Sequence, residues 1–212
     1  LDVLVPMMLR LPDDSEAWED AEPDDGLAHG DGDDEGESEA VYAQEALDRI
    51  GAVLDGEAVG AALLERLGSV GSAATGGWKQ AHVTLASVAI VSEHCPATLA
   101  PHLPNIVSRM AEAAAAAEPR ARWAAMFALA VLGDEFEELA SDYNAQLLPL
   151  IVGRLADQAP RVQSAAAVAA AGMCTQLQQA VLLSHAQELL SALLALLGSA
   201  ATRNFVAGAV AG

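Results

Sequence analysis

The sequence predicts an all-α fold, an α-α superhelix in which HEAT-type helix pairs stack in a row. Residues 119–125 (PRARWAA) return 41 positions later as residues 160–166 (PRVQSAA). Residues 103–110 (LPNIVSRM) also return, 45 positions later, as residues 148–155 (LPLIVGRL). Helix-turn-helix units that recur at roughly 40–47 residues are typical of HEAT and armadillo solenoids. Because one such unit cannot bury its apolar face alone, neighbours stack and share a continuous core.

The first expected element is the end of a helix, over residues 1–11. Leu4, Met7 and Met8 have helical spacing. Pro12 then ends the helix, because proline has no amide hydrogen to continue the ladder. We interpret this helix as the truncated last part of a preceding repeat.

We expect residues 12–40 to form one long acidic loop. Within it lies the acidic segment, residues 13–39, which contains no Lys or Arg and carries about −14 of the formal net charge of −20. Repulsion between like charges opposes a packed core here. The carboxylates are Asp13, Asp14, Glu16, Glu19, Asp20, Glu22, Asp24, Asp25, Asp31, Asp33, Asp34, Glu35, Glu37 and Glu39.

Three interpretations of the acidic segment stay open: a solvated spacer, an electrostatic arm for a basic partner, and a calcium-binding loop. The run from Asp31 to Glu35 lacks the alternating ligands and the distal Glu of an EF-hand, which disfavours calcium. Trp18 is the largest apolar residue of the segment. We expect that it could pin the segment to a surface.

Helix pairs follow the acidic segment. We expect a HEAT repeat and its link at residues 41–77, further repeats at 78–118, 119–159 and 160–200, and a truncated repeat at 201–212. An apolar stripe begins at about Val41, and the Gly- and Ala-rich stretch 68–77 reads as a link between repeats. The later helices are expected at residues 78–95, 98–116, 119–136, 142–157, 160–176 and 179–197.

Local signals refine these helices. Pro96 ends the helix before it, and Ser141 or Asp142 is the expected N-cap of the helix over residues 142–157. Residues 162–187 carry no formal charge. Because the repeat pattern divides them between two helices, we do not expect a membrane span there.

The two helices of each repeat differ in polarity. First helices are apolar nearly all round, which indicates burial on several sides. Arg120, Arg122 and Arg161 lie near their starts and are expected to pair with acids or carbonyls of adjacent repeats. Second helices keep a polar face that should line the concave side. The candidate concave-face residues are Asn105, Glu112, Asn144, Gln187 and Glu188.

Composition limits the classes of ligand. Aromatic residues are only 4% of the chain, which leaves few platforms for stacking nucleic-acid bases. A chain with a net charge of −20 repels phosphate backbones and anionic lipid headgroups and attracts basic partners. We therefore expect basic protein partners, no nucleic acid and no membrane insertion.

The sequence offers no catalytic or metal-binding pattern. It has no HExxH pair, no Gly-rich phosphate loop and no nucleophile elbow. Cys95 and Cys174 lie in separate apolar runs, which favours buried free thiols. The nearest approach to a metal cluster, His94 and Cys95 with His102, matches no usual zinc spacing. We expect no enzyme activity, no metal and no cofactor.

The serial order of several short motifs carries a resemblance. The order is DSEAW at residues 14–18, EALDRI at 45–50, a helix from WK at 78–79 to SEHCP at 92–96, then PRARWAA and RVQSAAA. This order resembles the β-karyopherins of the importin-β superfamily, in particular the importin-5 type, of which importin-4 is a close relative. The resemblance covers nearly the whole chain and corresponds to the central HEAT repeats of such a protein.

The resemblance implies a nuclear import receptor, monomeric and shuttling between cytoplasm and nucleus. Such a receptor imports cargo with a basic nuclear localisation signal and releases this cargo when Ran-GTP binds. It crosses the pore through contacts with Phe-Gly nucleoporins. It also implies that the carboxylates of the acidic segment touch Ran or basic cargo. The alternative is a HEAT-repeat scaffold without a transport role.

Overall fold

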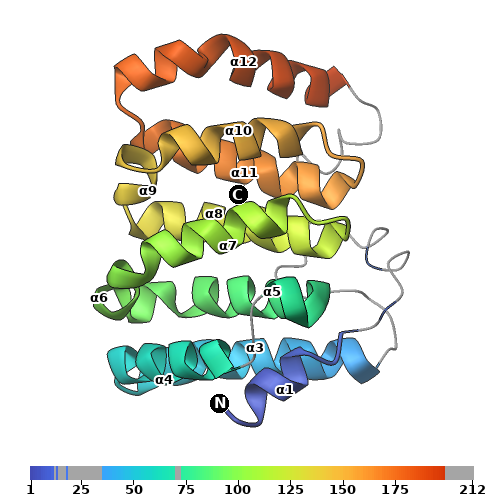
Figure 1. Ribbon diagram of the computed structural model, residues 1–212, viewed down its shortest axis with the longest axis vertical. Coiled ribbons are helices and arrows are strands. Elements are labelled where there is room, and N and C mark those ends of the chain that lie inside the picture. The colour runs from blue at the N-terminus through green and yellow to red at the C-terminus, as the bar shows by residue number, and fades with distance from the viewer. Residues whose placement is uncertain (12, 14–17, 19–34, 70–72, 199–212) are drawn as a thin grey trace.

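The computed structural model describes residues 1–11, 13, 18, 35–69 and 73–198. The described residues form helices joined by turns, and no strand occurs among them. The helices are arranged in a row of antiparallel pairs, from α3 and α4 at the bottom of Figure 1 to α12 at the top. The expected all-α solenoid is confirmed.

Two layers run along the row. First helices make one layer, in which α5 contacts α3 and α8, and α8 contacts α11. Second helices α4, α7, α10 and α12 make the other layer (Figure 1). The helices are α1 (Leu4–Met8), α3 (Glu35–Val53), α4 (Gly56–Ser69), α5 (Ala73–Val91), η1 (Ser92–His94), α6 (Pro96–Leu99), η2 (Ala100–His102), α7 (Leu103–Ala114), α8 (Pro119–Glu135), α9 (Glu138–Ser141), α10 (Asn144–Leu155), α11 (Pro160–Gln176) and α12 (Gln179–Gly198).

The repeated PR motif marks equivalent helix starts. Pro119 and Pro160 occupy the first turns of α8 and α11, where the missing amide hydrogen costs no intrahelical bond. Small residues then allow the two helices to approach closely. Ala121, Ala124 and Ala128 of α8 are fully buried. The repeat seen in the sequence therefore corresponds to a repeated packing unit.

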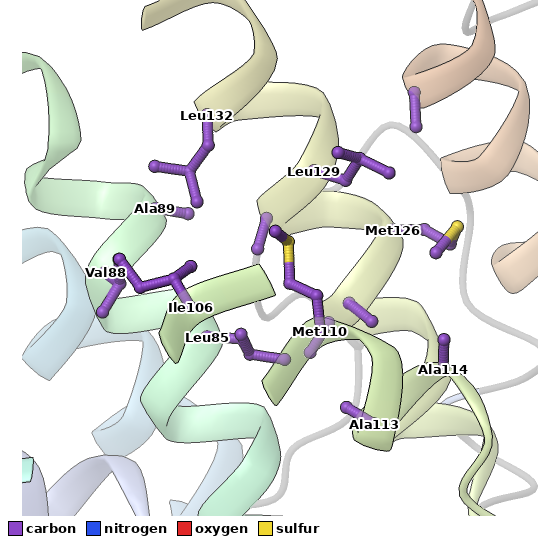
Figure 2. Packing of buried hydrophobic residues seen from close by; sticks show 14 of the residues in the cluster. Leu85, Val88, Ala89, Ile106, Met110, Ala113, Ala114, Met126, Leu129 and Leu132 are labelled. Atoms are coloured by element: carbon purple, nitrogen blue, oxygen red, sulfur yellow. The ribbon is translucent and has the colours of Figure 1, made fainter. Parts of the chain in front are cut away.

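The core lies between the layers. Figure 2 shows side chains of α5, α7 and α8 converging, with Met110 between Leu85 and Met126. These residues belong to one cluster of buried apolar side chains that extends through the described repeats. Such continuity is what the repeat pattern predicts, because each pair completes the core of its neighbour.

Some helix boundaries differ from those expected. Helix α3 begins at Glu35, before the expected start at Val41, so the acidic segment ends inside a helix. The expected link at residues 68–77 is shorter, because α4 extends to Ser69 and α5 begins at Ala73. Within α5 the helix is broken at Gly77, whose φ of 74° favours glycine.

The expected N-cap of α10 is wrong. Tyr143, not Ser141 or Asp142, occupies that position, and it makes no side-chain capping bond. A short helix, α9, occupies residues 138–141 instead. Nδ2 of Asn144 donates to the carbonyls of Ala140 and Ser141 and so satisfies the end of α9. The short helix was missed because its few residues show no periodicity.

Residues 162–187 are divided between α11 and α12, as expected, with a break at Leu177. Among the described residues, α12 alone has the length and apolar composition of a membrane-crossing helix. Its large apolar residues Leu183, Leu190 and Leu194 are exposed. In a solenoid, residues on this side of a helix pair are covered by the next pair.

An ion-pair cluster joins α8 to the end of α10, the two helices of one repeat. Both guanidinium nitrogens of Arg122 that face Asp157 lie within 2.8 Å of its carboxylate, and Arg154 adds a third bond at 2.8 Å. The side chain of Asp157 is only 1% exposed. Burial raises the pKa of Asp157, but the bonds from Arg122 and the Ala159 amide outweigh it and leave that pKa below its ordinary value.

We predict that Asp157→Asn lowers the free energy of unfolding by about 3 kcal/mol at neutral pH, because it leaves buried guanidinium groups without their anion. A group with a lowered native pKa stabilises the fold fully above its ordinary pKa, and this stabilisation is lost as the pH falls through the lowered native pKa. The difference between wild type and variant should therefore narrow as pH falls below about 4. Chemical denaturation at several pH values measures both effects. Asp134→Asn, at an exposed position on α8, should change stability by less than about 0.5 kcal/mol.

Candidate functional site

The acidic segment is described only in part. Asp13 and Trp18 are placed, and Glu35, Glu37 and Glu39 belong to α3. The other candidate carboxylates lie outside the described residues: Asp14, Glu16, Glu19, Asp20, Glu22, Asp24, Asp25, Asp31, Asp33 and Asp34. The site therefore has to be built from the two ends of the segment.

Asp13 contacts the starts of two first helices. Its carboxylate lies 2.9 Å from Nζ of Lys79 on α5, and its backbone carbonyl accepts a bond of 3.0 Å from Arg120 on α8. A hydrogen bond from Lys79, together with the charge of that ammonium group, lowers the pKa of Asp13. The guanidinium of Arg120 also stacks on the Trp78 ring, 3.7 Å from its centroid. The chain thus enters the segment across α5 and α8.

Trp18 continues this path to α8 and α11. Its carbonyl accepts a hydrogen bond of 2.8 Å from Arg161 at the start of α11. Its ring meets Trp123 of α8 edge-on, with centroids 6.3 Å apart, and Arg161 lies over it at 4.7 Å. Trp18 is only 8% exposed. The expectation that Trp18 pins the segment to a surface is confirmed. We call Trp18, Trp123 and Arg161 the Trp18 anchor.

A buried histidine packs against the Trp18 anchor. The ring of His82 on α5 stacks on Trp123 with centroids 5.5 Å apart. Its Nδ1 lies 3.1 Å from the carbonyl oxygen of Arg120, to which an Nδ1–H donates. Burial, assisted by the nearby charges of Arg120 and Arg161, lowers the pKa of His82 to about 4. The ring is therefore uncharged at physiological pH and packs flat against the Trp123 ring.

The end of the acidic segment is tied down separately. Glu39 on α3 pairs with Arg10 at 2.6 Å, across the gap to the residues that follow α1. Both side chains are largely exposed, so this pair contributes little to stability. The segment is thus held firmly at Trp18 and weakly at Glu39.

The arginines bind acids and carbonyls, as expected, but only some of these partners belong to an adjacent repeat. Arg122 donates to the carbonyls of Ala116 and Ala117 in the preceding repeat and pairs with Asp157 of its own repeat. Arg161 donates to the carbonyl of Trp18 in the acidic segment. Arg120 binds both kinds of partner, because it also pairs with Glu118 at 2.6 Å. Sequence reasoning placed these residues at helix starts, but it did not find that Arg120 and Arg161 hold the acidic segment. Their partner lies more than a hundred residues away, and no local signal reports such a contact.

The candidate concave-face residues lie on second helices, as expected, and are not brought into one site. Asn105 lines a cavity of ≈ 210 Å³ between α4, α5 and α7, with the buried Thr84 and the rim residue Arg109. Glu112 borders a separate hollow beside Trp78. Asn144 binds backbone carbonyls, and Gln187 and Glu188 are exposed on α12. Their role in binding stays a prediction.

The fold is similar to that of solved karyopherins. The karyopherin Kap121p bound to the SUMO protease Ulp1p matches with a TM-score of 0.79 and 23% identity, over 98% of this chain and 21% of that chain. Kap121p bound to RanGTP matches with a TM-score of 0.79 and 24% identity, over 94% and 19%. Kap121p bound to Pho4p gives 0.78 and 24%, over 94% and 19%. This chain shares their α-solenoid fold.

The chain spans about a fifth of the length of the Kap121p chains that it matches. No protein-family model and no curated protein matches it. At this level of identity the likeness concerns the fold. What the solenoid binds has to be argued from its own residues.

We predict that stability depends on pH through His82. In the unfolded chain its pKa returns to about 6.5, whereas the folded ring resists protonation down to about 4. The unfolded state therefore binds more protons in this window, and the free energy of unfolding falls as the pH is lowered. Between pH 6.5 and 5, His82 should lower the free energy of unfolding by about 1.5 kcal/mol. This decrease in stability should be absent in His82→Gln and unchanged in His102→Gln. An equal pH dependence of stability in the wild type and both variants would contradict the role of His82.

We predict that Trp18→Ala frees the start of the acidic segment. The change removes a cation–π contact and an aromatic edge contact, together worth about 2 kcal/mol. Local opening should then rise about 30-fold. A Glu-specific protease reports it, because Glu16 and Glu19 flank the anchor. Tyr42→Ala, at an exposed aromatic residue of α3, is the control, and equal cleavage rates in all three proteins would refute the anchor.

Proposed function

We propose that this chain is the central part of a nuclear import receptor of the β-karyopherin superfamily, of the importin-5 type. The receptor carries protein cargo with a basic nuclear localisation signal through the nuclear pore and is controlled by Ran-GTP. It acts as a monomer, is not an enzyme, contacts Phe-Gly nucleoporins and shuttles between cytoplasm and nucleus. Within it, the acidic segment contacts basic cargo or Ran.

The observation that carries this proposal is the Trp18 anchor. Two arginines of a chain with only 10 Lys and Arg residues hold the start of a segment that carries about −14. A spacer between two repeats has no need of such contacts, since a solvated loop closes at little entropic cost. A recognition element does need them, because they fix where its charge is presented.

The solved karyopherins with this fold lend support. Kap121p has been crystallised bound to RanGTP and to the proteins Pho4p and Nup53p. The same solenoid architecture, combined with the motif order in this sequence, favours a similar class of partner here. A scaffold without a transport role would share the fold, but the anchored acidic segment would be unexplained.

Electrostatics suggest how the segment works. Clustered carboxylates raise the rate at which a basic partner is captured, and salt weakens this steering because the Debye length is about 8 Å at physiological ionic strength. The Trp18 anchor keeps the start of the segment at α8 and α11. The partner is therefore drawn to these repeats rather than to the solenoid at large.

The test is binding of the full-length protein to a lysine-rich localisation peptide and to Ran-GTP at 50 and 200 mM salt. In one variant, the acids of residues 19–34 are replaced by Asn and Gln, which removes eight charges and keeps Trp18. We expect this change to weaken peptide binding at least tenfold at the lower salt concentration, and less at the higher one. In the matched control, eight exposed acids elsewhere are neutralised: Asp2, Asp55, Glu65, Glu112, Asp134, Glu135, Glu137 and Glu138.

The outcomes separate the alternatives. Binding that is lost in the segment variant and kept in the control supports the recognition role. Ran-GTP binding with unchanged peptide affinity in both variants would leave a receptor whose acidic segment is a spacer. Failure of the wild-type protein to bind either partner would contradict the transport role and favour the scaffold.

A further inference from the structure

Three side chains with metal-binding groups converge where two consecutive repeats meet. Asp48 is in the later turns of α3, and Glu93 and His94 form part of η1 at the end of α5. Nε2 of His94 lies 3.0 Å from Oδ1 of Asp48 and 3.3 Å from Oε1 of Glu93. All three ligand atoms lie within 4.8 Å of one another. They face solvent, since Asp48 and Glu93 are exposed.

Two carboxylates lie beside one ring nitrogen of His94. A single ring nitrogen carries at most one proton, so Nε2 has at most one N–H to donate. A proton on Nε2 can serve one carboxylate well and leaves the second anion facing it. A divalent cation between the three atoms would serve both carboxylates and the nitrogen lone pair together.

Close backbone packing holds His94 in this position. A Cβ added to Gly51 of α3 would lie 2.6 Å from Cδ2 of the His94 ring. One added to Gly56 at the start of α4 would lie 2.1 Å from the His94 carbonyl oxygen. Only glycine permits both approaches. The ring is therefore pressed against α3 with its Nε2 directed at Asp48, and its side chain is 15% exposed.

We propose that Asp48, Glu93 and His94 form a binding site for a divalent transition-metal ion, for which Zn²⁺ is the representative. Zinc binds histidine nitrogen and carboxylate oxygen at about 2.0–2.2 Å, so tetrahedral ligands lie about 3.4 Å apart. The two separations from Nε2 are already close to this value. Three protein ligands leave the fourth position to water, as in zinc sites that are open to solvent.

The neighbouring cysteine does not join the site. Sγ of Cys95 donates to the carbonyl of Val91 at 3.1 Å and packs against Gly60. Burial raises the pKa of the Cys95 thiol to about 11, which keeps it protonated. His102 lies at the cavity beside Asn105, away from this cluster. The ligand set therefore differs from the His94, Cys95 and His102 group considered from spacing.

A bound ion would connect two repeats. Asp48 belongs to the α3–α4 pair, whereas Glu93 and His94 end the first helix of the next pair. Solenoid curvature is the sum of small rotations between neighbouring pairs. The ion would restrain one such rotation, the one between α3 and α5. Helix α3 contains the end of the acidic segment, and α5 carries His82, which packs against the Trp18 anchor. This role is independent of the proposed transport function.

The test is calorimetric titration of the full chain with Zn²⁺ after removal of metal by a chelator. A variant with neutral residues 19–34 is titrated as well, because the acidic segment offers further carboxylates. Absorption of bound Co²⁺ reports the coordination geometry. We expect one Zn²⁺ per chain at micromolar concentration, kept in the segment variant, with the intense visible bands of tetrahedral Co²⁺.

Ligand variants decide the outcome. His94→Ala and Asp48→Asn should each weaken the binding at least tenfold, while His185→Gln leaves it unchanged. Asp48→Asn keeps the shape of the side chain, so it remains informative if His94→Ala disturbs the packing on Gly51. Absence of stoichiometric binding below 100 μM, or binding that survives both ligand variants, would overturn the site. The His94 contacts would then be an ion pair only.

Discussion

Burial between first helices is the constraint on which the rest of the structure depends. Helices α5, α8 and α11 are apolar on several sides, so each is stable only between its neighbours. Fully buried alanines such as Ala124 and Ala166 let the backbones approach. This approach aligns the helix starts in a row and brings Trp78, Trp123 and Arg161 from three repeats to one edge.

That row of helix starts explains how an acidic segment can be held by an acidic protein. Three of the 10 Lys and Arg residues of the chain lie at this edge. Lys79, Arg120 and Arg161 stand at the same edge, and they bind the first described residues of the segment through one carboxylate and two carbonyls. Because carbonyls accept two of these bonds, Asp13 supplies the one carboxylate among these three contacts.

The architecture could be predicted from the sequence because the same pattern of apolar residues and helix starts recurs in several repeats. The helix starts at Pro119 and Pro160 and the break near Leu177 follow from local signals that sequence reasoning can read. The short helix α9 was missed because its four residues are too few to show a helical period. The early start of α3 at Glu35 was missed because acidic residues there hide the apolar pattern of a helix. The contacts of Arg161 with Trp18 and of His94 with Asp48 join distant residues. No spacing rule reports them, so the site emerges only when the repeats are stacked.

The central claim is that the acidic segment starts from a fixed point on the first helices. Hydroxyl-radical footprinting with mass spectrometry tests it directly, because tryptophan oxidation follows side-chain exposure. In the free wild-type protein, Trp18 should oxidise as slowly as Trp123, since the two are 8% and 6% exposed. Both should oxidise rapidly in the denatured chain. Oxidation of Trp18 at the denatured rate in the folded protein, with Trp123 still protected, would contradict the account.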